Sequence, residues 1–236
     1  MEKNNLKKED SCNLILGVDD SGRGPVVGAM VLAGCLLTQE QIGKLRKLGV
    51  KDSKELTHKR REFLAEKIRE TAETFEVVIA HPREIDGSLN NGTNLNALEA
   101  LMTARIINKI NKGFKKIKVV VDCPSVSIEK WKDFLKTKIK NLSNLEVVCE
   151  HKADKNHLPV SAASILAKST REKEMDFLKE KYGQEIGSGY ASDPTTCRFL
   201  EKYAEKHKEE GIFRQTWKTW KNACAKLQQR TLISSH

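Results

Sequence analysis

The sequence predicts an α/β fold followed by a helical C-terminal region, for three reasons. Short apolar segments rich in β-branched residues alternate with longer amphipathic segments, which is the pattern of a buried sheet covered by helices. A polar, helix-like stretch follows the glycine-rich segment at residues 187–190. The chain has 236 residues, of which 39% are hydrophobic and 31% charged, so it is long and apolar enough to bury a core.

The expected elements follow from these patterns in chain order. Strands are predicted where apolar and β-branched residues run together, over residues 13–18, 26–37, 75–80, 117–121 and 145–149. Helices are predicted from the spacing of apolar residues, over residues 39–48, 58–74, 94–111, 126–139 and 160–182. We divide the chain into an α/β domain, residues 1–190, and a C-terminal helical region, residues 191–236.

The charge of the chain favours a polyanionic partner. The 42 Lys and Arg residues exceed the 32 Asp and Glu residues, which gives a formal net charge of +10 and favours nucleic acid or an anionic membrane surface. The longest apolar run, residues 25–37, is too short to span a bilayer. The first ten residues lack the apolar core of a signal peptide, so neither a membrane location nor secretion is expected.

The six cysteines indicate a reducing compartment. They form no Cys-x-x-Cys pair, and Cys35 and Cys123 lie inside apolar, strand-like runs, where a buried free thiol is expected. A cytoplasmic protein is therefore predicted.

Four aspartates fall at the ends of predicted strands. Asp19 and Asp20 follow the first strand, Asp122 ends the fourth, and Asp154 follows the fifth by a few residues. Strand ends in an α/β sheet converge on one crevice, so acids far apart in sequence can meet there. Clustered carboxylates repel one another unless a cation lies between them, and their oxygens suit Mg²⁺ or Mn²⁺. This arrangement favours phosphodiester cleavage with two metal ions.

Each of these features also has a purely structural explanation. Asp20 before Ser-Gly and Asp122 before Cys-Pro would both serve as turn residues, so spacing alone leaves the two interpretations open. The run from His151 to His157 lacks the cysteines and the spacing of a zinc site. Trp217 and Trp220 are expected to pack the last helix, with stacking on a nucleic-acid base as the alternative.

Several motifs resemble those of the type 2 ribonucleases H, the ribonuclease HII family, and the resemblance covers nearly the whole chain. The first is Gly17-Val-Asp-Asp-Ser-Gly-Arg-Gly-Pro25, which resembles the family signature. The others follow in the family's order: Gly49-Val-Lys-Asp-Ser-Lys-Glu-Leu56, Asn94-Leu-Asn96, Val119-Val-Val-Asp-Cys-Pro124, Glu150-His-Lys-Ala-Asp154 with Val160-Ser-Ala-Ala-Ser-Ile165, and Gly187-Ser-Gly-Tyr-Ala-Ser-Asp-Pro194.

The resemblance implies a ribonuclease H-like fold with a central mixed sheet, in which residues 1–190 form the catalytic domain and residues 191–236 bind substrate. It implies a metal-dependent endoribonuclease that cuts the RNA strand of RNA–DNA hybrids. It also implies cleavage 5′ of ribonucleotides embedded in duplex DNA, by two Mg²⁺ or Mn²⁺ ions, giving 3′-OH and 5′-phosphate ends. Ribonucleotide excision repair and DNA replication are the implied cellular roles.

The resemblance also assigns site residues by position. Four match the metal-binding, catalytic carboxylates: Asp19, Asp20, Asp122 and Asp154. Others match the substrate-binding residues: Gly22, Arg23 and Gly24 in a turn that meets the ribose 2′-OH, Tyr190 on the neighbouring sugar, Lys54 at a phosphate, and Ser161, Ser164 and Lys168 at the backbone. The family's second acid is usually Glu, so the shorter Asp20 puts the metal geometry in question.

The implied partners are RNA–DNA hybrids and ribonucleotide-containing duplexes, with the protein as a monomer. Gln229-Arg-Thr-Leu232 lacks the paired aromatics of a sliding-clamp docking peptide, so clamp docking has little support in the sequence. Residues 105–140 include eleven basic and three acidic residues, and the C-terminal region contains nine basic and five acidic residues. This distribution predicts that basic residues bind the phosphates of a duplex on either side of the protein's acidic site.

The sequence leaves two alternatives to the predicted type 2 enzyme. A hybrid-binding protein without activity would keep the basic surface, but it would gain nothing from clustered acids beside phosphates. The related type 3 enzyme is expected to carry an extra N-terminal domain and a Gly-Lys-Gly turn, whereas this chain has Arg23 at the middle of the turn and about a dozen residues before the first strand.

Overall fold

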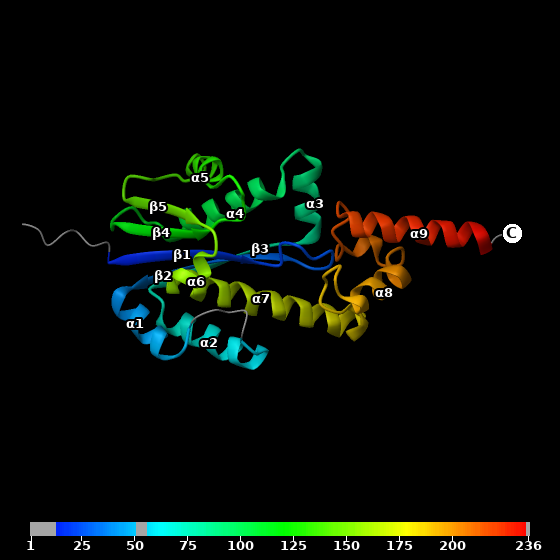
Figure 1. Ribbon diagram of the computed structural model, residues 1–236, viewed down its shortest axis with the longest axis horizontal. Helices are drawn as coiled ribbons and strands as arrows, with labels where there is room; N and C mark the ends of the chain where they lie inside the picture. Colours follow the sequence, from blue (N-terminus) through cyan, green and yellow to red (C-terminus); the bar gives the residue numbers. More distant parts are fainter. Residues whose placement is uncertain (1–12, 51–55, 235–236) are drawn as a thin grey trace, which may run out of the picture.

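A mixed sheet lies at the centre of the computed structural model, which describes residues 13–50 and 56–234. Its five strands lie in the order β3-β2-β1-β4-β5 (Figure 1). Their bounds are β1 Leu14–Ser21, β2 Met30–Thr38, β3 Thr74–Ala80, β4 Ile117–Asp122 and β5 Leu145–Glu150. β1, β2 and β3 pair antiparallel, whereas β4 and β5 run parallel to β1. The carboxyl ends of β1, β4 and β5 therefore meet at one edge of the sheet.

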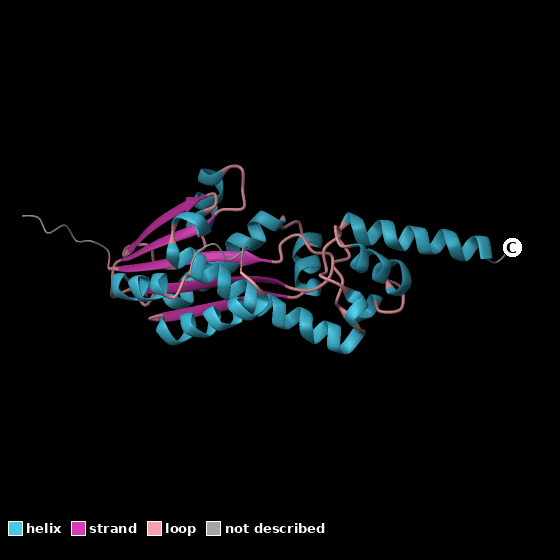
Figure 2. Cartoon of the chain, turned by 60° about the horizontal axis from the view of Figure 1, so that its bottom comes forward, coloured by secondary structure: helices cyan, strands magenta, loops and turns pink. Residues whose placement is uncertain are grey.

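Helices cover both faces of the sheet (Figures 1 and 2). One face packs against α1 Gln39–Lys47, α2 His58–Thr71 and α7 Leu158–Tyr182, through a core that includes Leu45, Leu64 and Ile165. The other face packs against α3 Pro82–Asn90, α4 Leu95–Ile110 and α5 Ile128–Lys136. A single turn of helix, α6 Ala153–Asn156, joins β5 to α7. The predicted α/β fold with a mixed sheet is confirmed.

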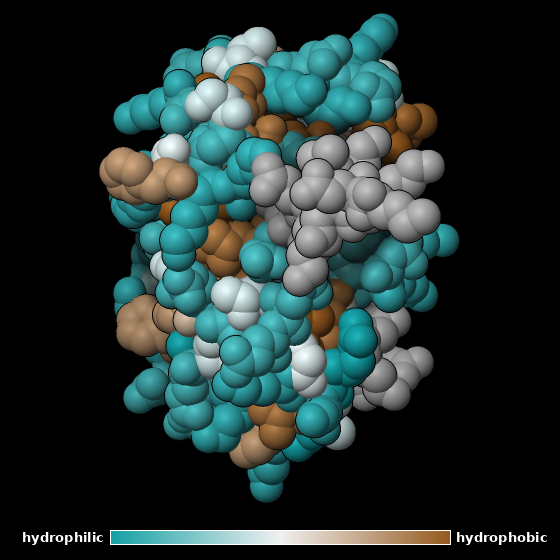
Figure 3. Space-filling view, turned by 90° about the vertical axis from the view of Figure 1, so that its left-hand side faces the viewer, coloured by the Kyte–Doolittle hydropathy of each residue, from teal (hydrophilic) through white to brown (hydrophobic). Residues whose placement is uncertain are grey.

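The C-terminal region forms a third core with part of the α/β domain. α8 Pro194–Tyr203 and α9 Lys218–Ser234 lie at the end of the molecule where α7 finishes, and α9 projects away from the sheet (Figure 1). Their apolar side chains pack with Val26 and Val27, which precede β2. The opposite end of the molecule is mostly hydrophilic, with small separate hydrophobic patches (Figure 3). The predicted division of the chain at residue 190 stays an interpretation.

Three details of the predicted secondary structure were wrong. The first strand was predicted to end at Val18, but β1 continues to Ser21, so Asp19 and Asp20 lie within the strand. The second strand was predicted from residue 26, but residues 26–28 pair instead with Gly189 and with residues 212–214, so β2 begins at Met30. Gly28 has φ +86°, which lets the chain turn between these two pairings. α3 was not predicted, because its segment is short and contains both Pro82 and Gly87.

The cysteine prediction is confirmed where the structure can address it. Cys35 and Cys123 are free and buried, and burial raises the pKa of the Cys35 thiol to about 12. Among the residues that the structure describes, no helix is long and apolar enough to cross a membrane.

Gly17 provides a test of how α7 is seated on the sheet. A Cβ atom at this position would lie 2.1 Å from the carbonyl carbon of Pro159 and 2.2 Å from the backbone nitrogen of Val160. Gly17→Ala should therefore push the start of α7 away from β1 and lower the free energy of unfolding by about 1–3 kcal/mol or more. Urea unfolding followed by circular dichroism measures the change.

Gly43→Ala is the matched control, because this glycine lies in α1 with no atom within 4 Å of the added carbon. It should raise stability by about 0.5–1 kcal/mol through helix propensity. A Gly17→Ala variant as stable as the wild type would contradict the close packing of α7 on β1.

Candidate active site

Parallel pairing of β1 and β4 brings two of the predicted carboxylates together. Val18 lies opposite Val121 in the register, so the next residues, Asp19 within β1 and Asp122 at the end of β4, lie side by side. Asp154 joins them from α6. One carboxylate oxygen from each of the three lies within 4.8 Å of the others. Three of the four acids predicted at the strand ends therefore form one cluster.

A tight turn after β5 brings Asp154 back to the cluster. Lys152 adopts a left-handed conformation, with φ 58°, that is uncommon for a residue other than glycine. The following backbone N–H, that of Ala153, donates a hydrogen bond of 3.3 Å to the Asp122 carboxylate. This bond ties the turn to β4, and Asp154 is then 98% buried, with 2% of its surface exposed. The unusual backbone conformation thus serves to place a carboxylate.

Two serines of α7 support the carboxylates from behind. Ser164 is fully buried and hydrogen-bonds to the Asp19 carboxylate. The Ser161 hydroxyl donates to the Asp154 carbonyl oxygen at 2.5 Å and is also buried. Both side chains are buried among these contacts, and the contact with the substrate backbone predicted for them stays a prediction. Lys168, one turn further along, is only half-buried, and its predicted contact remains a prediction.

The cluster holds negative charge in an unfavourable environment. Burial, together with the neighbouring charges of Asp20 and Asp122, raises the pKa of Asp19 well above its ordinary value. A divalent cation would remove this cost, and a set of carboxylate oxygens suits Mg²⁺ or Mn²⁺. The residues present therefore fit the divalent metal that the strand-end pattern predicts.

Asp20 lies apart from the three clustered aspartates. Successive side chains of a strand point to opposite faces, so Asp19 points towards α7 while Asp20 points towards α4. On that side lies Glu99, a buried residue of α4 whose pKa is raised to about 8 by burial and by the charge of Asp20. Asp20 and Asp122 both line a small cavity at the strand ends, so Asp20 still borders the site. The metal role predicted for it is untested.

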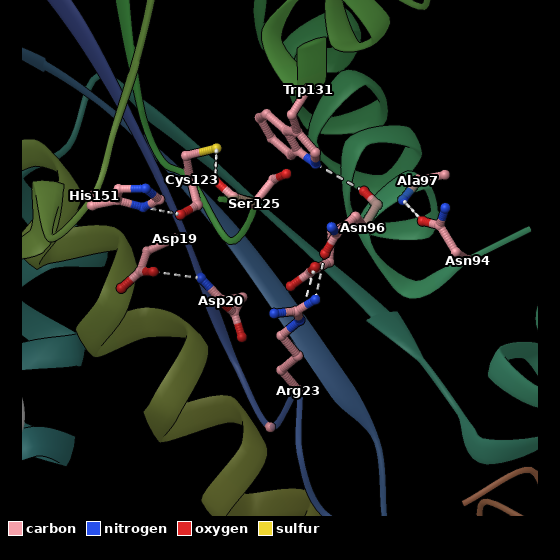
Figure 4. A network of polar contacts seen from close by, with 12 residues as sticks. Asp19, Asp20, Arg23, Asn94, Asn96, Ala97, Cys123, Ser125, Trp131 and His151 are labelled. Atoms are coloured by element: carbon pink, nitrogen blue, oxygen red, sulfur yellow. Dashed lines mark hydrogen bonds and ion pairs between the residues drawn. The ribbon is translucent and has the colours of Figure 1, made fainter. Parts of the chain in front are cut away.

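Glu99 is a site residue that the sequence analysis missed. Its carboxylate forms an ion pair with Arg23, whose Nε lies 3.0 Å from Oε2, and another nitrogen of the guanidinium donates to the Asn96 side chain at 2.5 Å (Figure 4). The Arg23 side chain is thus tied inward to α4. A signal was available in the sequence, because Glu99 interrupts an otherwise apolar helix face between Leu98 and Met102.

The turn of residues 22–24 lies beside Tyr190. A Cβ atom at Gly24 would lie 3.8 Å from the Tyr190 ring. Arg171 connects the two: its side chain fills the space beside Gly22, and its guanidinium lies 5.0 Å from the centroid of the Tyr190 ring. Tyr190 keeps 37% of its surface exposed. The structure therefore brings together the predicted turn and the predicted aromatic residue, far apart in sequence. Lys54 lies outside the described residues.

Comparison with known proteins identifies relatives of this arrangement. The family model described as Ribonuclease HII matches residues 16–220. A ribonuclease HII from Methanococcus maripaludis is 41% identical over 234 residues, covering 98% of this chain and 96% of the relative.

Two solved structures share both sequence and fold with this chain. The ribonuclease H2 from Pyrococcus horikoshii OT3 is 36% identical with a TM-score of 0.81, over 91% of this chain and 99% of that one. The ribonuclease HII in a complex with PCNA from Archaeoglobus fulgidus is 39% identical with a TM-score of 0.77, over 89% and 96%. The fold is thus ribonuclease H-like.

Asp19→Asn tests the electrostatic cost of the cluster. The raised pKa means that the folded protein holds this proton at pH values where the unfolded chain has lost it, so stability falls as pH rises above about 4. In a metal chelator at neutral pH, Asp19→Asn should therefore raise the melting temperature. Adding Mn²⁺ should then raise the melting temperature of the wild type more than that of the variant.

Asp176→Asn is the control, because Asp176 is exposed on α7 and its substitution removes the same charge. It should leave the Mn²⁺ effect unchanged. Equal Mn²⁺ shifts in the wild type and Asp19→Asn would contradict the metal site.

Proposed function

Since the chain belongs to the ribonuclease HII family, and is thus a metal-dependent endoribonuclease of RNA–DNA hybrids, we propose that it also cuts 5′ of single ribonucleotides embedded in duplex DNA. The products would be a 3′-OH and a 5′-phosphate. One observation carries this proposal. The turn 22–24 lies next to Tyr190, and it follows directly after the strand that bears Asp19. The groups proposed to recognise the sugar therefore lie next to the carboxylates proposed to bind the catalytic metal ions.

Asp19, Asp122 and Asp154 would hold two divalent ions, Mg²⁺ or Mn²⁺, with Asp20 at the border of the same site. Bound ions of this kind activate a water molecule and stabilise the leaving 3′ oxygen. The chain's own residues keep the three carboxylates in place: Ser164 fixes Asp19, and the N–H of Ala153 fixes Asp122. These contacts come from the chain itself and restrict the orientations of the carboxylates, which favours preorganisation for ion binding.

The ribose would be recognised by backbone groups of residues 22–24. Glycine at positions 22 and 24 lets the main chain approach a sugar closely, and N–H groups can donate to the 2′-OH oxygen that only RNA has. Arg23 contributes its backbone here, because its side chain is bound to Glu99 and Asn96. Tyr190 would pack on the sugar that follows the ribonucleotide and so favour an RNA–DNA junction.

The remaining contacts would act on the phosphates. Lys54 would contact a phosphate near the cut, and Lys168 would contact the backbone. The excess of basic residues between positions 105 and 140 would add electrostatic attraction. Ribonucleotide excision repair and DNA replication in the cytoplasm are the processes that this activity would serve.

Docking to a sliding clamp is a further proposed interaction. The relative from Archaeoglobus fulgidus was solved as a complex with PCNA, and this chain covers 96% of that relative. In this chain Gln229 lies on α9, the helix that projects from the body (Figure 1). The projection leaves the end of α9 accessible to a partner.

A duplex with one ribonucleotide, incubated with and without Mg²⁺, tests the proposed activity and the role of Asp122. Asp122→Asn should lower the cleavage rate at least about a hundredfold, because one ligand of the metal centre loses its charge. Its affinity for the hybrid should stay the same or rise at low salt, because a negative charge beside the phosphates is removed.

Asp133→Asn, on the exposed surface of α5, removes the same charge and should cleave like the wild type. Wild-type turnover by Asp122→Asn would show that the strand-end site is not the cutting centre. If the unmodified protein left the single-ribonucleotide duplex intact with both Mg²⁺ and Mn²⁺, the proposed activity would be wrong.

Tyr190→Ala tests selection of the junction. Without the ring, kcat/KM on the single-ribonucleotide duplex should fall by about tenfold to a hundredfold, the loss of one stacking contact. Cleavage of a continuous RNA–DNA hybrid should fall much less, because many alternative registers remain available on that substrate. Equal losses on both substrates would contradict the junction role.

A further inference from the structure

The carbonyl groups of the turn 22–24 are all held by two residues of the C-terminal region. The guanidinium of Arg214 donates to the carbonyl oxygens of Gly22 at 2.6 Å and Arg23 at 2.8 Å. The indole Nε1 of Trp217 donates to the carbonyl oxygen of Gly24 at 3.1 Å. Three successive peptide groups thus point their oxygens to the same side.

The same bonds fix where the N–H groups of the turn point. In a trans peptide the C=O and the following N–H point in opposite directions, and the described chain contains no cis peptide bond. Holding the Gly22 and Arg23 carbonyls therefore turns the N–H groups of Arg23 and Gly24 away from Arg214. Within the part of the chain that the structure describes, neither N–H donates to an acceptor. Adjacent outward N–H groups form a concave donor site for a ligand oxygen.

Arg214 is built to stay in this position. Its side chain has no exposed surface, and its third donor, Nε, binds the Gly28 carbonyl oxygen at 3.1 Å. Its guanidinium also lies 5.0 Å from the Trp217 ring centroid, so the two side chains support each other. Burying a charged group without such partners would be costly, and here the carbonyl oxygens compensate for it.

The segment that carries both residues is anchored to α3. The Asp86 carboxylate accepts from the backbone N–H groups of Gln215 at 2.7 Å and Thr216 at 3.1 Å, and from the Thr216 hydroxyl at 2.5 Å. These bonds fix the chain between Arg214 and Trp217. The turn is therefore held on one side by α4, through Arg23 and Glu99, and on the other by the C-terminal region.

We propose that Arg214 and Trp217 are positioning residues for ribonucleotide recognition. By holding the carbonyl groups of residues 22–24, they aim the N–H groups of Arg23 and Gly24 at the ribose 2′-OH. This inference rests on the proposed role of the turn, and it adds which side chains orient the N–H groups of the turn. The C-terminal region then sets sugar specificity in addition to any contact of its own with the duplex.

The test compares binding of two duplexes that differ in one hydroxyl group. Dissociation constants are measured by fluorescence anisotropy, in Mg²⁺, for a DNA duplex with one ribonucleotide and for the same duplex with a deoxyribonucleotide there. All proteins carry Asp122→Asn so that nothing is cleaved. The readout is the ratio of the two constants, because a partly unfolded sample weakens both equally and leaves the ratio unchanged.

Two substitutions act on the turn and one serves as the control. Trp217→Phe keeps an aromatic ring beside Arg214 but removes the donor to Gly24, and it should lower the preference for the ribonucleotide duplex about three- to tenfold, the effect of one hydrogen bond. Arg214→Lys keeps the charge but loses the guanidinium group that donates to several carbonyl oxygens at once. It should lower the preference for the ribonucleotide duplex further than Trp217→Phe does. Trp220→Phe makes the same chemical change as Trp217→Phe at a buried residue that packs on Phe213, and should keep the wild-type ratio.

The outcomes separate this inference from the proposed function. A clear preference in the parent protein that Trp217→Phe and Arg214→Lys both retain would overturn the positioning role and leave the proposed function standing. A parent protein that binds both duplexes equally would overturn the proposed function and the inference with it. A reduced ratio in both variants, with the Trp220→Phe ratio unchanged, supports the inference.

Discussion

The repulsion among carboxylates held together at the carboxyl ends of the parallel strands is the constraint on which the structure depends. The register of β1 against β4 leaves Asp19 no position except beside Asp122, and the turn at Lys152 adds Asp154 within 4.8 Å. Burial makes the repulsion stronger and is reflected in the raised pKa of Asp19. Hydrogen bonds from Ala153 of α6 and Ser164 of α7 hold two of the carboxylates in place despite this repulsion. Such a centre gains stability when a cation binds.

The half of the site proposed to recognise the sugar has the opposite polarity, because it presents N–H donors, and it is held by different parts of the chain. Its turn continues directly from β1, so the position of the acids and the position of the N–H donors are set by the same strand. Glu99 connects the halves, since it faces Asp20 on one side and binds Arg23 on the other. The groups proposed for cutting and for sugar recognition are therefore connected through one residue. The net charge of +10 favours binding to phosphates without specificity.

Much of the fold and the acidic centre followed from the sequence because those signals are local. Apolar runs located the strands, and acids at the ends of parallel strands had to converge. The alternation of side chains along β1 already implies that Asp19 and Asp20 face opposite sides, although the sequence analysis grouped them together. Arg214 gave no local signal: its partners are some 190 positions away in sequence, at Gly22 and Arg23, and an arginine in a basic region resembles any surface arginine. Such contacts become visible only once the chain has folded.

The central claim is that Asp19, Asp122 and Asp154 bind the divalent metal that cuts the substrate. A crystal grown or soaked with Mn²⁺, with data collected near the manganese absorption edge, tests this most directly. The account predicts an anomalous peak within coordination distance of oxygens from all three carboxylates, and the same map shows whether Asp20 reaches an ion. A peak bound only by Asp20 and Glu99, or no peak at the strand ends at saturating Mn²⁺, would contradict it.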